Sequence, residues 1–324
     1  MLKQAAKNIG KSIARAAIFY ATGTMLVSGA IFTNAQRFIS NKKNLADMTQ
    51  AARSAEKSPD PDLYKFANDC KLINSPQDSL SLNDYSYGYS DEPAPGDQKV
   101  NLENYTKVDL RENEISIVDA LEKAKKEGKD SILFVSGDLE GNRVEYQTIS
   151  KEKLSDIYAH NKESQEKLGL NGIEIIVEND APHLAYSKAL PFEVACSPHL
   201  FNKLREATNV IFDHETAHLA EAAKSPLSNF KSNWVNTVNY VGQFMGVRMS
   251  DPAEDHADYI AGKLDPNNAK AVLYEFAPIR RGGNYTRERF ESSLGAMAIM
   301  DQRSGPDAHS SKIVRIKNFV KAAR

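Results

Sequence analysis

Apolar and polar positions follow a helical period in the centre of the chain. The apolar positions in this stretch are Leu204, Ala207, Ile211, Phe212, Leu219 and Ala222. Residues three or four apart lie on one face of a helix, so the pattern predicts an amphipathic helix here. Pro226 cannot continue a helix, and we expect the helix to end just before it.

Upstream of this helix, helical and strand patterns follow one another. The predicted elements are a helix at 115–124 that stops near Gly128, strands at 132–135 and 143–149, a helix at 151–168 and a strand at 173–178. Strand 173–178 fits either a sheet edge that could receive an extended peptide or a central position. This order predicts an α+β fold, mostly helical with a small β-sheet.

Two further apolar patterns lie towards the C-terminus. One covers residues 234–245 and predicts a helix packed in the core. The other predicts a C-terminal amphipathic helix, because lysines alternate with an apolar stripe of Ile313, Ile316, Phe319 and Val320. Together these patterns favour a single domain over residues 107–324, which is long enough to bury its own core.

The N-terminal pattern differs from that of the rest of the chain. Basic residues recur every four positions from Lys3 to Arg15, no acidic residue precedes Asp47, and the 21 residues between Arg15 and Arg37 carry no charge. A basic segment followed by such a stretch predicts a signal or membrane anchor over residues 1–46. The protein would then work in the cell envelope, membrane-anchored or periplasmic, or be exported. A mitochondrial transit peptide is the alternative.

Residues 47–106 predict a linker or loosely packed extension. A short helix is expected before the turn-forming sequence at 58–61, and residues 74–104 are rich in Asp, Ser, Pro, Gly and Tyr. This composition offers little apolar surface to bury. The tyrosines could instead lie across the following domain as a cover.

Overall composition narrows the classes of function. The net charge of -2 gives no electrostatic basis for nucleic-acid binding. The chain has two cysteines, Cys70 and Cys196. In an exported protein they could form one disulfide, whereas in the cytosol they would be buried thiols.

Candidate chemistry enters with the sequence His214-Glu215-Thr216-Ala217-His218 in the central helix. Residues four apart share a helix face, so both imidazoles can bind one metal ion while Glu215 reaches a ligand on its open side. This is the chemistry of a zinc hydrolase, in which a carboxylate beside the metal acts as general base. The alternative is a surface pair of histidines on an ordinary helix.

A third metal ligand is expected from a second helix that begins near Pro252. Zinc in catalytic sites binds three protein side chains. Glu254 and Asp258 lie one turn apart, so Glu254 can be the third ligand while Asp258 braces a ligating histidine. His256 is the rival ligand but points to a different side of the helix. Asp255 is interpreted as an acidic residue that favours the helix N-terminus.

These motifs resemble the gluzincin metallopeptidases related to the HtpX heat-shock protease and the CAAX prenyl protease. The shared pattern is HExxH, then E-x-x-A-D-x-x-A at Glu254, Ala257, Asp258 and Ala261, then His309 and Arg315 six apart in a late element. Ser310 stands where the family usually has proline, and the resemblance covers roughly residues 172–319. It implies a zincin-like fold, zinc bound by His214, His218 and Glu254, and His309 or Arg315 as donor to the oxyanion of peptide hydrolysis.

The expected function is therefore that of a zinc-dependent endopeptidase acting on unfolded or membrane-associated proteins, with Glu215 as general base. A metal-binding but catalytically inactive module that binds polypeptides is the alternative. The expected partners are a protein or peptide substrate and, through the N-terminal segment, a membrane, but no nucleic acid. Substrate identity and oligomeric state stay open.

Overall fold

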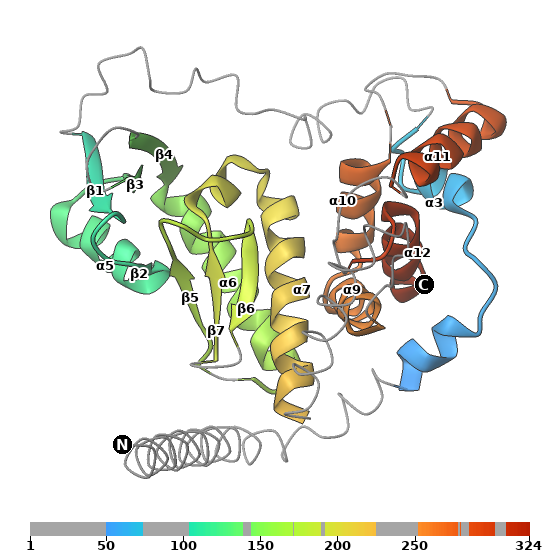
Figure 1. Ribbon diagram of the computed structural model, residues 1–324, viewed down its shortest axis with the longest axis horizontal. Helices are drawn as coiled ribbons and strands as arrows, with labels where there is room; N and C mark the ends of the chain where they lie inside the picture. The colour runs from blue at the N-terminus through green and yellow to red at the C-terminus, as the bar shows by residue number, and fades with distance from the viewer. Residues whose placement is uncertain are drawn as a thin grey trace, which may run out of the picture.

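Helices predominate in the protein, and its strands form two small mixed sheets (Figure 1). The computed structural model describes residues 50–73, 104–138, 144–170, 172–188, 192–224, 252–277, 279, 285–301 and 309–324. About 60% of the structure is helical, so the predicted α+β, mostly helical fold class is confirmed, with two sheets where one was expected. The predicted anchor at 1–46 and the predicted helix at 234–245 lie outside the described residues. Among the helices that are described, none is both long and apolar enough to cross a bilayer.

The two sheets differ in strand number and order. One has the order β1-β3-β4, with β1 (Tyr105–Asp109) parallel and β4 (Val144–Ser150) antiparallel to β3 (Ser131–Gly137). The other has the order β2-β5-β7-β6 and consists of β2 (Ile115–Ser116), β5 (Glu174–Val177), β7 (Glu193–Cys196) and β6 (Ala185–Lys188). The predicted strand at 173–178 is therefore central as β5, and the described edges of that sheet are β2 and β6.

One hydrophobic core joins the sheets to α5 (Ile117–Glu127), α6 (Lys151–Lys167) and the 3₁₀ helix η3 (Pro198–Asn202). Within this core Phe134 stacks on Phe201, with ring centroids 5.6 Å apart. Ser116 and Ser150 cap the first turns of α5 and α6 through their hydroxyl oxygens, which explains where these helices begin. Gly128 ends α5 in the left-handed conformation at φ 67°, as the predicted stop requires.

A second hydrophobic core is built from helices and the loops beside them. Most of its residues lie in α3 (Leu63–Asp69), α10 (Asn267–Phe276), α11 (Arg287–Asp301) and α12 (Lys312–Ala323). A short helix at 50–56 precedes α3, as predicted. The prediction of a linker or loosely packed extension over 47–106 misses α3, because Leu63 and Ala67 are buried in this core and β1 starts at Tyr105.

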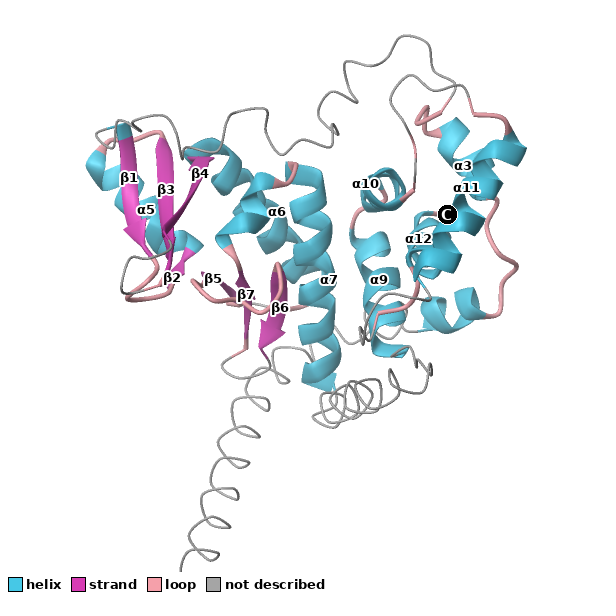
Figure 2. Cartoon of the chain, turned by 45° about the horizontal axis from the view of Figure 1, so that its top comes forward, coloured by secondary structure: helices cyan, strands magenta, loops and turns pink. Residues whose placement is uncertain are grey.

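Two helices, α7 (Arg205–Lys224) and α9 (Pro252–Leu264), lie side by side, with the sheets on the far side of α7 and α12 on the far side of α9 (Figures 1 and 2). Both contribute to both cores: Ala217 and Ala257 to the first, Val210 and Ala261 to the second. The predicted helix that ends before Pro226 is α7. On its other side α9 packs against α12, where Gly262 permits a close approach.

The approach at Gly262 leaves no room for a larger residue. A Cβ atom at this position would lie 2.7 Å from Cβ of Ala322 and 3.1 Å from the carbonyl oxygen of Phe319. Both neighbours belong to α12, and one of these atoms is backbone. The lack of a side chain at 262 therefore sets the distance between α9 and α12.

The two cysteines lie in different cores and are both free thiols. Cys196 is buried in β7 beside the first core, and burial raises its pKa far above the ordinary value. Cys70 caps the C-terminus of α3. The disulfide that the sequence allowed for an exported protein is therefore not formed in this structure.

Candidate metal centre

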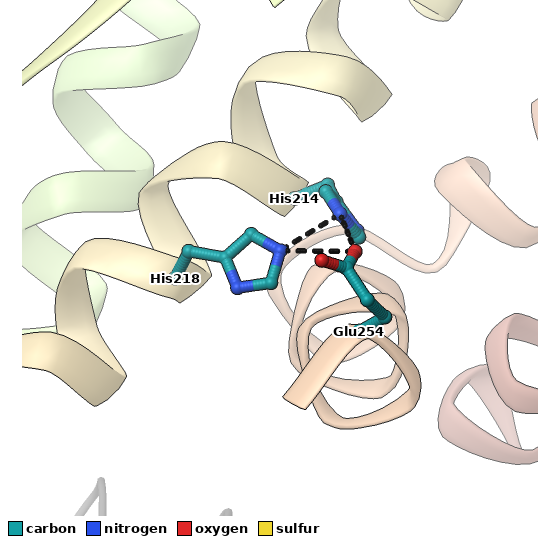
Figure 3. Close-up of side chains that lie close together, drawn as sticks. All are labelled: His214, His218 and Glu254. Atoms are coloured by element: carbon teal, nitrogen blue, oxygen red, sulfur yellow. Dashed lines mark hydrogen bonds and ion pairs between the residues drawn. The ribbon is translucent and has the colours of Figure 1, made fainter. Parts of the chain in front are cut away.

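Three side chains from α7 and α9 converge at the boundary between the two cores (Figure 3). His214 and His218 extend from α7, one turn apart, and Glu254 extends from the first turn of α9. Nε2 of His214 lies 3.1 Å from Nε2 of His218 and 3.1 Å from Oε2 of Glu254. The third side of the triangle, from His218 Nε2 to the same oxygen, measures 3.2 Å. Among the described residues, these three form the one group of His, Cys, Asp and Glu that could hold a metal ion.

The size and chemistry of this triangle fit a metal ion. Ligand atoms about 2.0–2.1 Å from a tetrahedral zinc ion lie roughly 3.3 Å from one another, and two imidazoles with one carboxylate are a recurrent donor set of catalytic zinc. The three separations in the triangle lie within a few tenths of an ångström of that value. The group can therefore bind a metal ion, and its donors suit zinc.

Asp258 lies behind the triangle, one turn along α9 from Glu254. Its Oδ1 is 2.8 Å from Nδ1 of His214, the ring nitrogen that faces away from the other two donor atoms. This is the position from which a carboxylate fixes the orientation of a ligating histidine. Burial raises the pKa of Asp258, but the charges of Arg315 and His214 outweigh it and hold this pKa far below the ordinary value.

Arg315 of α12 faces Asp258. Its Nε and Nη2 donate hydrogen bonds of 2.9 and 2.8 Å to the two carboxylate oxygens, and the guanidinium lies over the ring of Phe276 with 5.4 Å to the centroid. Such a paired geometry neutralises a carboxylate that is fully buried. Arg315 was one of the two residues predicted to donate to the oxyanion. In the structure two of its nitrogen atoms instead donate to Asp258.

His309, the other predicted oxyanion donor, lies beside the three candidate metal ligands. Its Nε2 is 2.9 Å from Oε2 of Glu254, and its ring stacks on that of His214 with centroids 5.6 Å apart. A third of the side chain, 32%, is exposed, so it faces solvent on one side and the ligands on the other. This location allows contact with a bound substrate.

The charged groups of the centre shift one another's pKa. Burial raises the pKa of Glu254, but hydrogen bonds from His214 and His218 lower it far below the ordinary value. Burial lowers the pKa of His214, whereas Asp258 and Glu254 raise it to about 10. Glu215 on α7 is half-buried, and its charge also raises the pKa of His214. The carboxylates thus create a site of negative potential that favours a cation.

The remaining described histidines lie outside the triangle. His199 contacts Glu145 and Gln147 of β4, and His183 is exposed. His256, the rival ligand, has Nδ1 3.8 Å from Oε1 of Glu221, on another side of α9. His160 contacts Asp213. Glu254 thus lies in the triangle and His256 lies outside it, on different sides of α9.

Two acidic residues have contacts that the sequence did not predict. Oδ2 of Asp213, which directly precedes the motif, accepts hydrogen bonds from His160 at 3.0 Å and Asn268 at 2.6 Å, linking α7 to α6 and α10. Asp255 accepts a hydrogen bond of 3.1 Å from Asn318 of α12 and another from Ser310. Both residues are adjacent in sequence to a candidate metal ligand, and that adjacency was the one signal in the sequence.

Comparison of the chain with protein family models, with curated proteins and with solved structures found no match. Function is therefore inferred from the chemistry of the site.

Proposed function

We propose that the protein is a zinc-dependent endopeptidase with a zincin-like active site on α7 and α9. The observation that carries the proposal is the triangle of His214, His218 and Glu254, whose donor atoms lie 3.1–3.2 Å apart, with Glu215 directly after His214 on α7. A structural zinc site normally has four protein ligands, whereas three leave a position for water and substrate.

Each residue has a defined task in this proposal. His214, His218 and Glu254 would hold the zinc ion, which when bound lowers the pKa of a water molecule and polarises a carbonyl group. Glu215, a carboxylate outside the ligand set, accepts a proton from the attacking water and passes it to the leaving amine. Asp258, itself paired with Arg315, fixes the ring of His214. His309 donates to the oxygen of the substrate carbonyl as negative charge develops on it.

The substrate class follows from the resemblance and from the N-terminal pattern. Gluzincins of the HtpX and CAAX prenyl protease type act at membranes, and residues 1–46 have the composition of an anchor or signal. We propose unfolded or membrane-associated proteins of the cell envelope as substrates. A metal-binding module without hydrolytic activity is the second candidate, and the same experiment separates the two.

The test compares the full-length wild type with Glu215→Gln on a denatured, alkylated protein substrate. Zinc content is measured first and should be equal, because Glu215 is not among the three ligands. Loss of the general base should reduce the cleavage rate by about 10²–10⁴-fold. Glu206→Gln is the matched control, since it makes the same change on α7 more than two turns away. Stoichiometric zinc without cleavage by the wild type would favour the binding module.

A further inference from the structure

The polar contacts between the start of α9 and the segment before α12 form two adjacent pairs. Glu254 contacts His309. The residues that follow them in sequence, Asp255 and Ser310, also contact each other. Asp255 also accepts a hydrogen bond of 3.1 Å from Nδ2 of Asn318, two turns further along α12. The carboxylate of Asp255 thus joins α9 to both the beginning and the middle of the C-terminal segment.

The contact of His309 with Glu254 cannot by itself hold His309 in place once a cation is bound. Oε2 of Glu254 is the atom that faces both ligating histidines, and Nε2 of His309 contacts this same oxygen. A cation on Oε2 withdraws electron density from it and weakens it as a hydrogen-bond acceptor. His309 then needs a support that does not involve the ligand oxygens.

The half-buried Asp255 and the buried Ser310 provide that support. Ser310 is only 9% exposed, directly follows His309 and precedes the first residue of α12 by two positions. Oδ2 of Asp301, at the end of α11, accepts a hydrogen bond of 2.8 Å from the backbone N–H of Lys312 and so fixes the start of the helix. The stretch between His309 and Lys312 is therefore held at both ends, by Asp255 and by Asp301.

We infer that Asp255 is a positioning residue that, through Ser310 and Asn318, keeps His309 over the metal centre. The inference rests on the proposed peptidase function and assigns part of the geometry of its site to a residue outside the ligand set. Serine at 310 is what allows this contact, because its hydroxyl donates to the carboxylate and a proline side chain could not.

Kinetics test the role of Asp255 in the full-length protein. Asp255→Ala should lower kcat by about 10–100-fold while KM stays within about 2-fold, as expected for loss of a group that orients a transition-state contact. Asp255→Asn should keep kcat within about 3-fold of the wild type, because its amide oxygen still accepts from Ser310. Asp69→Ala, which removes an exposed carboxylate paired with Lys65 on its own helix, is the control.

A double-mutant cycle tests whether Asp255 acts through His309. If it does, Asp255→Ala combined with His309→Ala should be no slower than His309→Ala alone. A double variant whose loss equals the product of the two single losses would overturn the inference. Ser310→Ala repeats the cycle with the smallest possible change, in case Asp255→Ala folds poorly.

Amide hydrogen exchange supplies a readout that does not depend on activity. In metal-free protein, Asp255→Ala should speed exchange of the amides at 309–316 by about 10-fold or more, with no matching change in α5 or α6. Unchanged exchange in this segment would overturn the inference. If the wild type cleaves nothing, the proposed peptidase function fails, and exchange alone then decides whether Asp255 holds the segment.

Discussion

The two sides of the candidate metal centre are built from different kinds of contact. His214 and His218 come from one helix, α7, which packs on the sheet-containing core through apolar residues such as Phe212 and Leu219. Glu254 comes from α9, where polar pairs connect Asp255 and Asp258 to α12. The main support of the histidine side is apolar packing, to which Asp213 adds polar contacts with α6 and α10, whereas the glutamate side depends on specific charged contacts with α12.

This difference predicts that stability and metal affinity can be changed separately. Apolar substitutions on the sheet side should destabilise the fold while leaving the metal-binding geometry of the remaining folded molecules intact. Polar substitutions between α9 and α12 should weaken metal binding in the folded molecules, in addition to any loss of stability. Three variants, ordered from the largest expected effect to the smallest, test this separation.

Phe134→Ala should have the largest effect on stability. Phe134 is fully buried in β3 and stacks on Phe201, so its truncation should lower the free energy of unfolding by about 3–5 kcal/mol. Urea unfolding measures this change, and the zinc affinity of the folded fraction should be unaltered. Tyr146→Ala, an aromatic on the neighbouring strand that is 39% exposed, is the control and should cost about 0.5 kcal/mol or less. A weakened zinc site in Phe134→Ala would show that the two sides are not independent.

Asp258→Asn should have the second largest effect, and the quantity that it changes is the affinity for zinc. Replacing the carboxylate beside Nδ1 of His214 should weaken zinc binding by about 10–100-fold, or about 1.4–2.7 kcal/mol. Competition with a chromogenic chelator measures the affinity. Asp130→Asn changes a carboxylate that is 95% exposed and should leave the affinity unaltered. Unchanged zinc affinity in Asp258→Asn would mean that packing alone orients His214.

Asp60→Asn should have the smallest effect. The Asp60 side chain is 61% exposed and pairs with Lys317 and Lys321 of α12, so its loss should cost less than about 1 kcal/mol at pH 7. A hydrogen bond from Lys317 lowers the pKa of Asp60, so the ion pair stabilises the folded state above about pH 4, the pKa range of an unfolded aspartate. The advantage of the wild type should therefore disappear as the pH falls through the lowered pKa. Acid titration of stability checks this, and a loss above about 2 kcal/mol would make Asp60 a main support of α12.

How much of the structure the sequence predicts depends on how local each pattern is. The helices α5, α6, α7 and α12 and the strands β3, β4 and β5 have periods that are visible within a few residues, and all were predicted. In contrast, α3 has seven residues, of which Leu63 and Ala67 are buried. Two apolar positions make no recognisable period, and they become part of a core only through contacts with distant helices.

The same distinction applies within the site. The spacing of His214 and His218, and of Glu254 and Asp258, follows from helix geometry, so residues that share a face could be named in advance. The partner of Arg315 could not be named, because the carboxylate that it binds lies 57 positions earlier on another helix. The partners of Asp255 were missed for the same reason, since a charge at a helix start has an adequate local explanation.

Gly262 gives the metal centre a dependence on a residue that does not touch it. The helix that carries Glu254 and the helix that carries Arg315 meet at this glycine with no space for a methyl group. Any enlargement at 262 must push the two helices apart, and a rigid helix transmits that displacement along its whole length. The distance of Glu254 from the two histidines therefore depends on a residue two turns further along α9, whose side chain is a single hydrogen atom.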